Sequence, residues 1–88
     1  MKKTIILTIA GTDFSFNVTA QDQGDYLDAI ARGSSISAAS HNFAMRAIDS
    51  KQKDDFKKLL DGAPGAELQI ASELKNDFSP ALAITVKK

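Results

Sequence analysis

Apolar and polar positions alternate at the two ends of the chain, with the two-residue period of a β-strand. Near the N-terminus, Ile5, Leu7 and Ile9 fall on one face of such a strand. Residues 14–19 repeat the pattern, with Phe14 at its start. A short glycine-containing loop separates the two runs, which predicts an N-terminal β-hairpin.

In the middle of the chain the apolar residues recur with the period of an α-helix instead. Asp22 is a candidate N-cap for a first helix, which Gly33 would end. Ser37 is a candidate cap for a second helical stretch that continues to Gly62. Ser50 within this stretch is either a short break or a new cap. The stretch therefore contains one kinked helix or two.

The C-terminal part predicts one more helix and then a strand. The helix is expected to start near Pro64 and to end at Ser79, because the following proline disfavours helical geometry in the residue before it. Beyond it, Leu82, Ile84 and Val86 form one apolar face of a predicted strand. A lone hairpin is only marginally stable, so we expect this strand to complete a small antiparallel or mixed sheet.

Together these patterns predict an α+β fold with an N-terminal β-hairpin, three to four helices and a C-terminal strand. Residues 1–88 are expected to form a single domain, because no linker, repeat or low-complexity tract interrupts them. The N-terminal apolar run is too short for a signal peptide, and no run approaches the roughly 20 apolar residues of a membrane span. We therefore expect a protein of the cytoplasm, without a membrane partner.

The residue types offer little catalytic chemistry. The chain has no cysteine, which removes thiolate nucleophiles and cysteine-bound metals. The single histidine, His41, is followed at helical spacing by Ala44 and Met45, and neither provides a second strong metal ligand. The glycines do not follow a phosphate-binding motif. We expect no enzyme activity, cofactor or metal site.

Charge is balanced over the whole chain, with 11 basic and 11 acidic residues, but it is unevenly placed. Residues 32–60 carry a net charge of +3 and residues 61–79 a net charge of −3. Opposed patches of this kind favour mixed-charge helical partners. Nucleic acid is the alternative partner, through the basic helix of residues 51–58. Zero net charge and an aromatic content of 7% argue against it.

Two groups of residues are candidates for contact with a partner. Asn42 and Arg46 lie four residues apart, on one helix face beside His41, and form a possible polar recognition edge. The alternative is that Arg46 lies over the core with its charged end in water. The second group is a narrow apolar stripe on an otherwise charged helix. The alternative is that these side chains belong to the core, and in so small a domain this alternative is favoured. This stripe consists of Phe56, Leu59 and Leu60.

Several stretches, taken together and in order, resemble a family of small tail assembly chaperones from long-tailed bacteriophages and related prophages. They are ILTIAGTDFSFNVT, HNFAMRAI, PGAELQIASEL and LAITVKK. These motifs are structural rather than catalytic. The resemblance implies a non-enzymatic protein of the bacterial host cytoplasm that binds the tape measure protein, keeps it soluble and assists tail tube assembly.

The same resemblance implies partners beyond the tape measure protein, namely the tail tube protein and further copies of the chain itself. It supplies no residue-level binding site. The alternative function is that of a small adaptor or regulatory domain, which could bind nucleic acid through the helix of residues 51–58.

Overall fold

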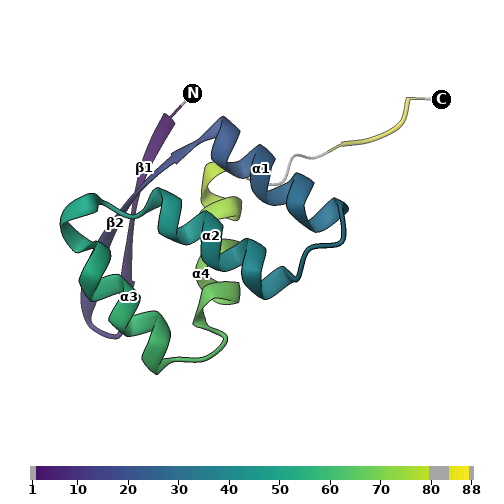
Figure 1. The fold of residues 1–88 in the computed structure, drawn as a ribbon. Coiled ribbons are helices and arrows are strands. Elements are labelled where there is room, and N and C mark those ends of the chain that lie inside the picture. Colours follow the sequence, from purple (N-terminus) through teal and green to yellow (C-terminus); the bar gives the residue numbers. More distant parts are fainter. Residues whose placement is uncertain (1, 80–83, 88) are drawn as a thin grey trace.

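The computed structural model describes residues 2–79 and 84–87. A hairpin of two antiparallel strands leads into four α-helices, so the predicted α+β class is confirmed. Figure 1 shows the helices gathered against the hairpin. The elements are β1 (Lys2–Ile9), β2 (Thr12–Thr19), α1 (Ala20–Ala31), α2 (Ile36–Ala47), the short 3₁₀-helix η1 (Ser50–Gln52), α3 (Lys53–Gly62) and α4 (Ala66–Phe78).

The hairpin closes through a two-residue turn at Ala10 and Gly11. Both residues have positive φ, 51° and 83°, which is the backbone of a type I′ turn. The turn lies earlier than the predicted loop, because Thr12 already pairs with Ile9 in the ladder. Its twist matches that of the flanking strands, so β1 and β2 stay paired along their whole length.

The predicted apolar face of β2 is the centre of the core. Phe14, Phe16 and Val18 are buried, with at most 3% of their surface exposed. The ring of Phe56 from α3 packs against both phenylalanines, at centroid distances of 5.5 Å from Phe14 and 5.2 Å from Phe16. On β1 only Ile5 of the predicted face is fully buried.

The first two helices begin one or two residues before the predicted caps. Thr19 is the N-cap of α1, and Asp22 completes a capping box with it: the Thr19 hydroxyl accepts from the Asp22 amide at 3.0 Å, and the Asp22 carboxylate accepts from the Thr19 amide at 3.3 Å. Ser35 rather than Ser37 caps α2. The two candidates also make tertiary contacts: Asp22 pairs with Arg46, and the Ser37 hydroxyl donates to Glu67.

The stretch around Ser50 forms two helices separated by η1. The connection covers the outer edge of β2. Ile48 makes an isolated antiparallel bridge with Phe16, and the Asp49 amide donates to the Ser15 carbonyl at 2.9 Å. The Gln52 side chain accepts from the Ser15 amide at 2.8 Å. These bonds occupy main-chain groups that a third strand would otherwise use.

The predicted C-terminal strand is not seen, and this part of the prediction is wrong for the described residues. Residues 84–87 have no regular secondary structure, and Ile84 and Val86 are 80% and 83% exposed. Leu82 lies outside the described residues. Alternation makes a segment compatible with a strand, but a strand exists only when its backbone is paired. Among the helices described here, none is both long and apolar enough to cross a lipid bilayer.

The turn predicts opposite effects of two neighbouring substitutions on stability. Ala10→Asn should raise the free energy of unfolding by about 0.5–1 kcal/mol, because Asn tolerates left-handed backbone better than Ala does. Gly11→Ala should lower it by about 1–2 kcal/mol. A Cβ at Gly11 meets no heavy atom within 4 Å, so the loss would come from the backbone alone. Urea unfolding measures both, and a neutral Gly11→Ala would contradict the assignment.

Candidate functional site

The exposed side of α2 carries the three polar residues that the sequence singled out. His41, Asn42 and Arg46 are all exposed, and we call them the α2 edge. The helix is held in place by its opposite side, which is buried against α1, α4 and the hairpin. The buried residues are Ala39, Ser40, Phe43, Ala44 and Ala47.

Two hollows flank the α2 edge. One, of about 520 Å³, lies toward α3 and α4 and is lined by His41, Asn42 and Leu60 among others. The other, of about 530 Å³, lies toward α1 and η1 and is lined by Asn42 and Arg46 among others. Asn42 borders both, so the three residues form one continuous surface. Each hollow contains charge: Asp61 and Glu67 line the first, and Asp22, Arg46 and Lys53 line the second.

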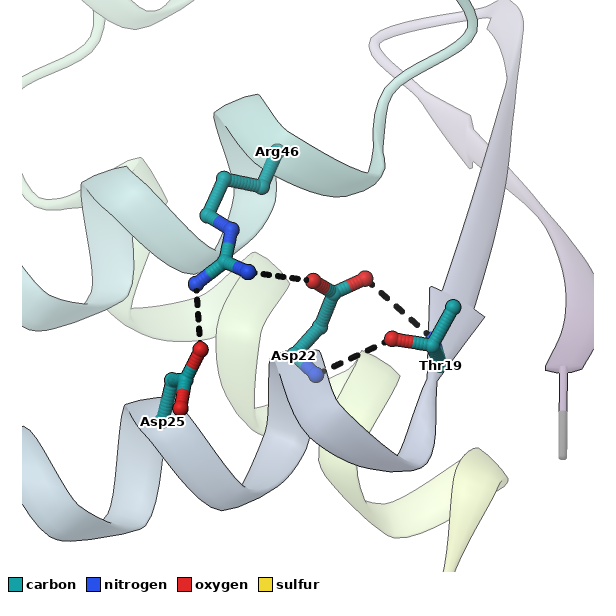
Figure 2. Close-up of polar contacts among 4 residues, drawn as sticks. All are labelled: Thr19, Asp22, Asp25 and Arg46. Carbon is teal, nitrogen blue, oxygen red and sulfur yellow. Dashed lines mark hydrogen bonds and ion pairs between the residues drawn. The ribbon is translucent and has the colours of Figure 1, made fainter.

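Arg46 is held by two carboxylates of α1, as Figure 2 shows. One guanidinium nitrogen lies 2.9 Å from an Asp22 oxygen and the other 2.9 Å from an Asp25 oxygen. The hydrogen bond to Asp25 and the charges of both carboxylates raise the pKa of Arg46, against the effect of partial burial. Asp22 also belongs to the capping box with Thr19. Arg46 therefore links α2 to the N-terminus of α1.

Sequence reasoning missed this cluster. Asp22 was expected to cap the first helix, and Arg46 to lie over the core or to meet a partner. The available signal was the pair of aspartates one helical turn apart, which can share one arginine. The pairing leaves Arg46 half-exposed, at 49% of its side-chain surface, so each ion pair should contribute only about 0.2–1 kcal/mol.

A double-mutant cycle on Arg46 and Asp22 tests this link. Arg46→Met keeps the apolar stem, and Asp22→Asn keeps the shape of the side chain. We expect a coupling energy of about 0.5–1 kcal/mol in urea unfolding, falling in 1 M salt because the pair is partly exposed. Lys57→Met, at an exposed position of α3, is the matched control and should not couple to Asp22→Asn. Zero coupling between Arg46 and Asp22 at low salt would contradict the assignment.

On the other side of the α2 edge, a hydrogen bond ties α2 to α4. The Ser37 hydroxyl donates to a Glu67 carboxylate oxygen at 2.8 Å. This bond is the main reason that the pKa of Glu67 lies below its ordinary value, with help from main-chain hydrogen bonds at the start of α4 and from the charge of His41. Glu67 is therefore a fixed negative charge in the hollow beside His41.

The Ser37–Glu67 bond predicts a shift in acid titration. A carboxyl group with a lowered pKa in the folded state stabilises the fold at neutral pH, and this contribution is lost as the pH falls through that pKa. Ser37→Ala should raise the pKa of Glu67 toward its ordinary value of 4.5, as followed by carboxyl carbon NMR. Ser72→Ala, at an exposed position of α4, is the control. An unchanged Glu67 titration in Ser37→Ala would refute the role of this bond.

The structure separates the three apolar candidates of α3. Phe56 has no exposed surface and belongs to the core, which was the location expected for the apolar stripe. Leu60 is 6% exposed but lines the hollow beside His41. Leu59 is half-buried and packs against the core. Of the three, Leu60 alone lines one of the two hollows beside the α2 edge.

The lysines of the predicted basic helix are exposed but do not form an uninterrupted basic face. They are Lys51 on η1 and Lys53, Lys57 and Lys58 on α3, and the exposed Asp54 and Asp55 lie between them along the chain. Within residues 2–79 and 84–87, no group of three histidine or acidic side chains is placed to hold a metal ion.

Comparisons with known proteins give a family and a fold. A family model described as phage tail assembly chaperone matches residues 5–88, nearly the whole chain. The chain also resembles a solved structure of an uncharacterised protein from Bacillus stearothermophilus, with a TM-score of 0.74 and 19% sequence identity over 97% of this chain and 90% of that one. At that identity the likeness shows a shared fold. A search of curated proteins finds no match.

Proposed function

The chain belongs to the phage tail assembly chaperone family, and we propose that it binds a tape measure protein and assists tail tube assembly without catalysing a reaction. The observation that carries this proposal is the family match over residues 5–88. The tape measure protein is proposed as the client because the sequence resembles chaperones that bind it. Tape measure proteins of long-tailed phages are very long and largely helical. We place the activity in the host cytoplasm, where tails assemble.

The α2 edge is the surface that we assign to the client. A long amphipathic helix exposes apolar stripes that would aggregate, with charges along its flanks. Two adjacent hollows that share Asn42 and carry both signs of charge can accept such a helix. His41 and Asn42 are exposed and can meet polar groups of the client, whereas Arg46 already pairs with two carboxylates of α1.

We further propose that several copies of the chain cover one client, and that the tail tube protein is a second partner. The support is the charge distribution. Residues 32–60 are basic overall and residues 61–79 acidic, so one copy can present opposite signs to a neighbour. A small domain covers only a short stretch of a long helix, so keeping the whole client soluble needs many copies.

Co-expression with a tape measure protein tests the function and the surface separately. The wild-type chain should keep the client soluble and co-purify with it. Asn42→Arg adds bulk at the border of both hollows and should reduce the co-purified client at least about fivefold, the loss expected when a central interface contact fails. Asn76→Arg, the same change at an exposed position of α4, is the matched control and should retain the client.

The outcomes distinguish the claims. No gain in client solubility and no co-purification with the wild-type chain would overturn the proposed function. Equal retention by Asn42→Arg and Asn76→Arg would leave a chaperone but overturn the α2 edge as its binding surface. Retention of the wild-type chain on DNA or RNA, with a steep loss as salt rises, would favour the nucleic-acid alternative through Lys51, Lys53, Lys57 and Lys58.

A further inference from the structure

The two edges of the hairpin differ in how their main-chain groups are occupied. In an antiparallel ladder, every second residue directs its N–H and C=O away from the partner strand. On β2 these residues include Asp13 and Ser15, whose outward groups are bonded by the connection after α2. Their partners in the register are Thr8 and Ile6 of β1. Thr4, Ile6 and Thr8 therefore direct their main-chain groups to the outer edge of β1.

The outer edge of β1 has none of the usual protection of an exposed strand. Within residues 2–79 and 84–87, β1 pairs with β2 alone, and no main-chain bond reaches Thr4, Ile6 or Thr8 from another element. Proteins commonly shield such an edge with a proline, a bulge, a central charge or a very short strand. β1 has eight residues in an unbroken register, and residues 4–9 contain no charge and no proline. An edge of this kind is a template for a strand of another chain.

Apolar side chains lie beside this edge on both faces of the strand. Ile6 is 64% exposed, on the face of the hairpin opposite to the core. On the core side, a groove of about 790 Å³ between β1 and α4 is lined by Leu7, Ile9 and Leu68 among others. Leu68 is itself 40% exposed. A strand that pairs with β1 would therefore bury apolar surface on both of its faces.

A second copy of β1 fits this edge in antiparallel register. About a two-fold axis at Ile6, each Ile6 lies opposite its counterpart, and Thr4 of one copy lies opposite Thr8 of the other. All of these residues direct their main-chain groups to the edge, so each N–H and C=O meets a complementary group. On the core side, Leu7 lies opposite Ile5 of the second copy, which makes an apolar cross-strand pair.

The same register brings opposite charges together. Lys3 of the second copy lies opposite Ile9, beside the part of the groove that Glu73 lines. Lys3 pairs with Asp77 of its own chain, whereas Lys2 forms no ion pair among the described residues. The basic start of each β1 can therefore lie near the Glu73 carboxylate of the other copy. This complementarity favours the antiparallel arrangement.

We propose that two copies of the chain associate through β1, edge to edge and antiparallel, so that two two-stranded hairpins form one continuous four-stranded sheet. A second copy is favoured over an unrelated strand because the edge complements itself in its main-chain groups, apolar side chains and charges. No residue of β1 lines either hollow of the α2 edge. The dimer therefore presents two α2 edges, both open to other partners.

Sedimentation equilibrium of the chain alone tests this association, and its outcome does not depend on whether the protein binds a tape measure protein. The mean mass should rise from that of one chain toward that of two between about 10 μM and about 1 mM, as expected for a small interface. The mass of one chain throughout this range would overturn the proposal.

Two matched substitutions test the surface. Ile6→Lys places a charge at the centre of the interface, opposite the same charge of the second copy, and should raise the dissociation constant of the dimer at least about tenfold. Ile36→Lys makes the same change at the start of α2, where Ile36 is 56% exposed, and should leave the dissociation constant unchanged. Both positions are exposed, so circular dichroism should show the same fold in both variants. Equal effects of the two substitutions on association would overturn the proposal.

Amide hydrogen exchange measured by NMR locates the pairing on the strand. The amides of Thr4, Ile6 and Thr8 should exchange about fivefold more slowly, or slower still, at about 1 mM than at about 20 μM protein. The amides of Ile5 and Leu7, which are directed to β2, are internal controls and should not depend on concentration in this way. Protection of Thr4, Ile6 and Thr8 that is the same at both concentrations would show that the edge is covered within one molecule, which contradicts the dimer.

Discussion

The packing of Phe16 on Phe56 is the contact on which the rest of this fold depends. Phe16 has no exposed surface, lies at the centre of β2, and packs on the Phe56 ring in a T-shaped arrangement with the ring centroids 5.2 Å apart. A two-stranded hairpin is only marginally stable in water, so β2 needs the helices to cover its apolar face. Ile48 extends this contact by bridging to Phe16, which places the end of α2 against the same strand.

The burial of the aromatic residues decides which surfaces are open to a partner. Phe56 is the largest apolar side chain of α3, and all of its surface is buried in the core. Among the described residues, two hollowed surfaces remain that are polar or mixed: the α2 edge between its two hollows, and the groove between β1 and α4. Both suit helical or extended protein chains, in keeping with a family whose members assemble other proteins.

The sequence predicted those features that depend on local periodicity. The faces of β2 and the presence of the helices follow from apolar spacing, and the exposed α2 edge follows from helical geometry. The helix caps lie two or three residues before their predicted positions. Thr19 and Asp22, like Ser35 and Ser37, are residue types that can all cap a helix, so the sequence does not choose between them. The Arg46 cluster was missed, since the pair of aspartates on α1 does not identify its arginine until the packing of α1 on α2 is known. The C-terminal strand failed because alternation does not specify a pairing partner.

The central claim is that the α2 edge binds an amphipathic helical client while the aromatic core stays unchanged. Its most direct test is a two-dimensional NMR titration of the labelled chain with a soluble segment of a tape measure protein. The account predicts saturable shifts of the His41 and Asn42 amides, with those of Phe16 and Phe56 unmoved. A bound segment that shifts only residues 51–58 or the β1–α4 groove, or that leaves every amide in place, would contradict it.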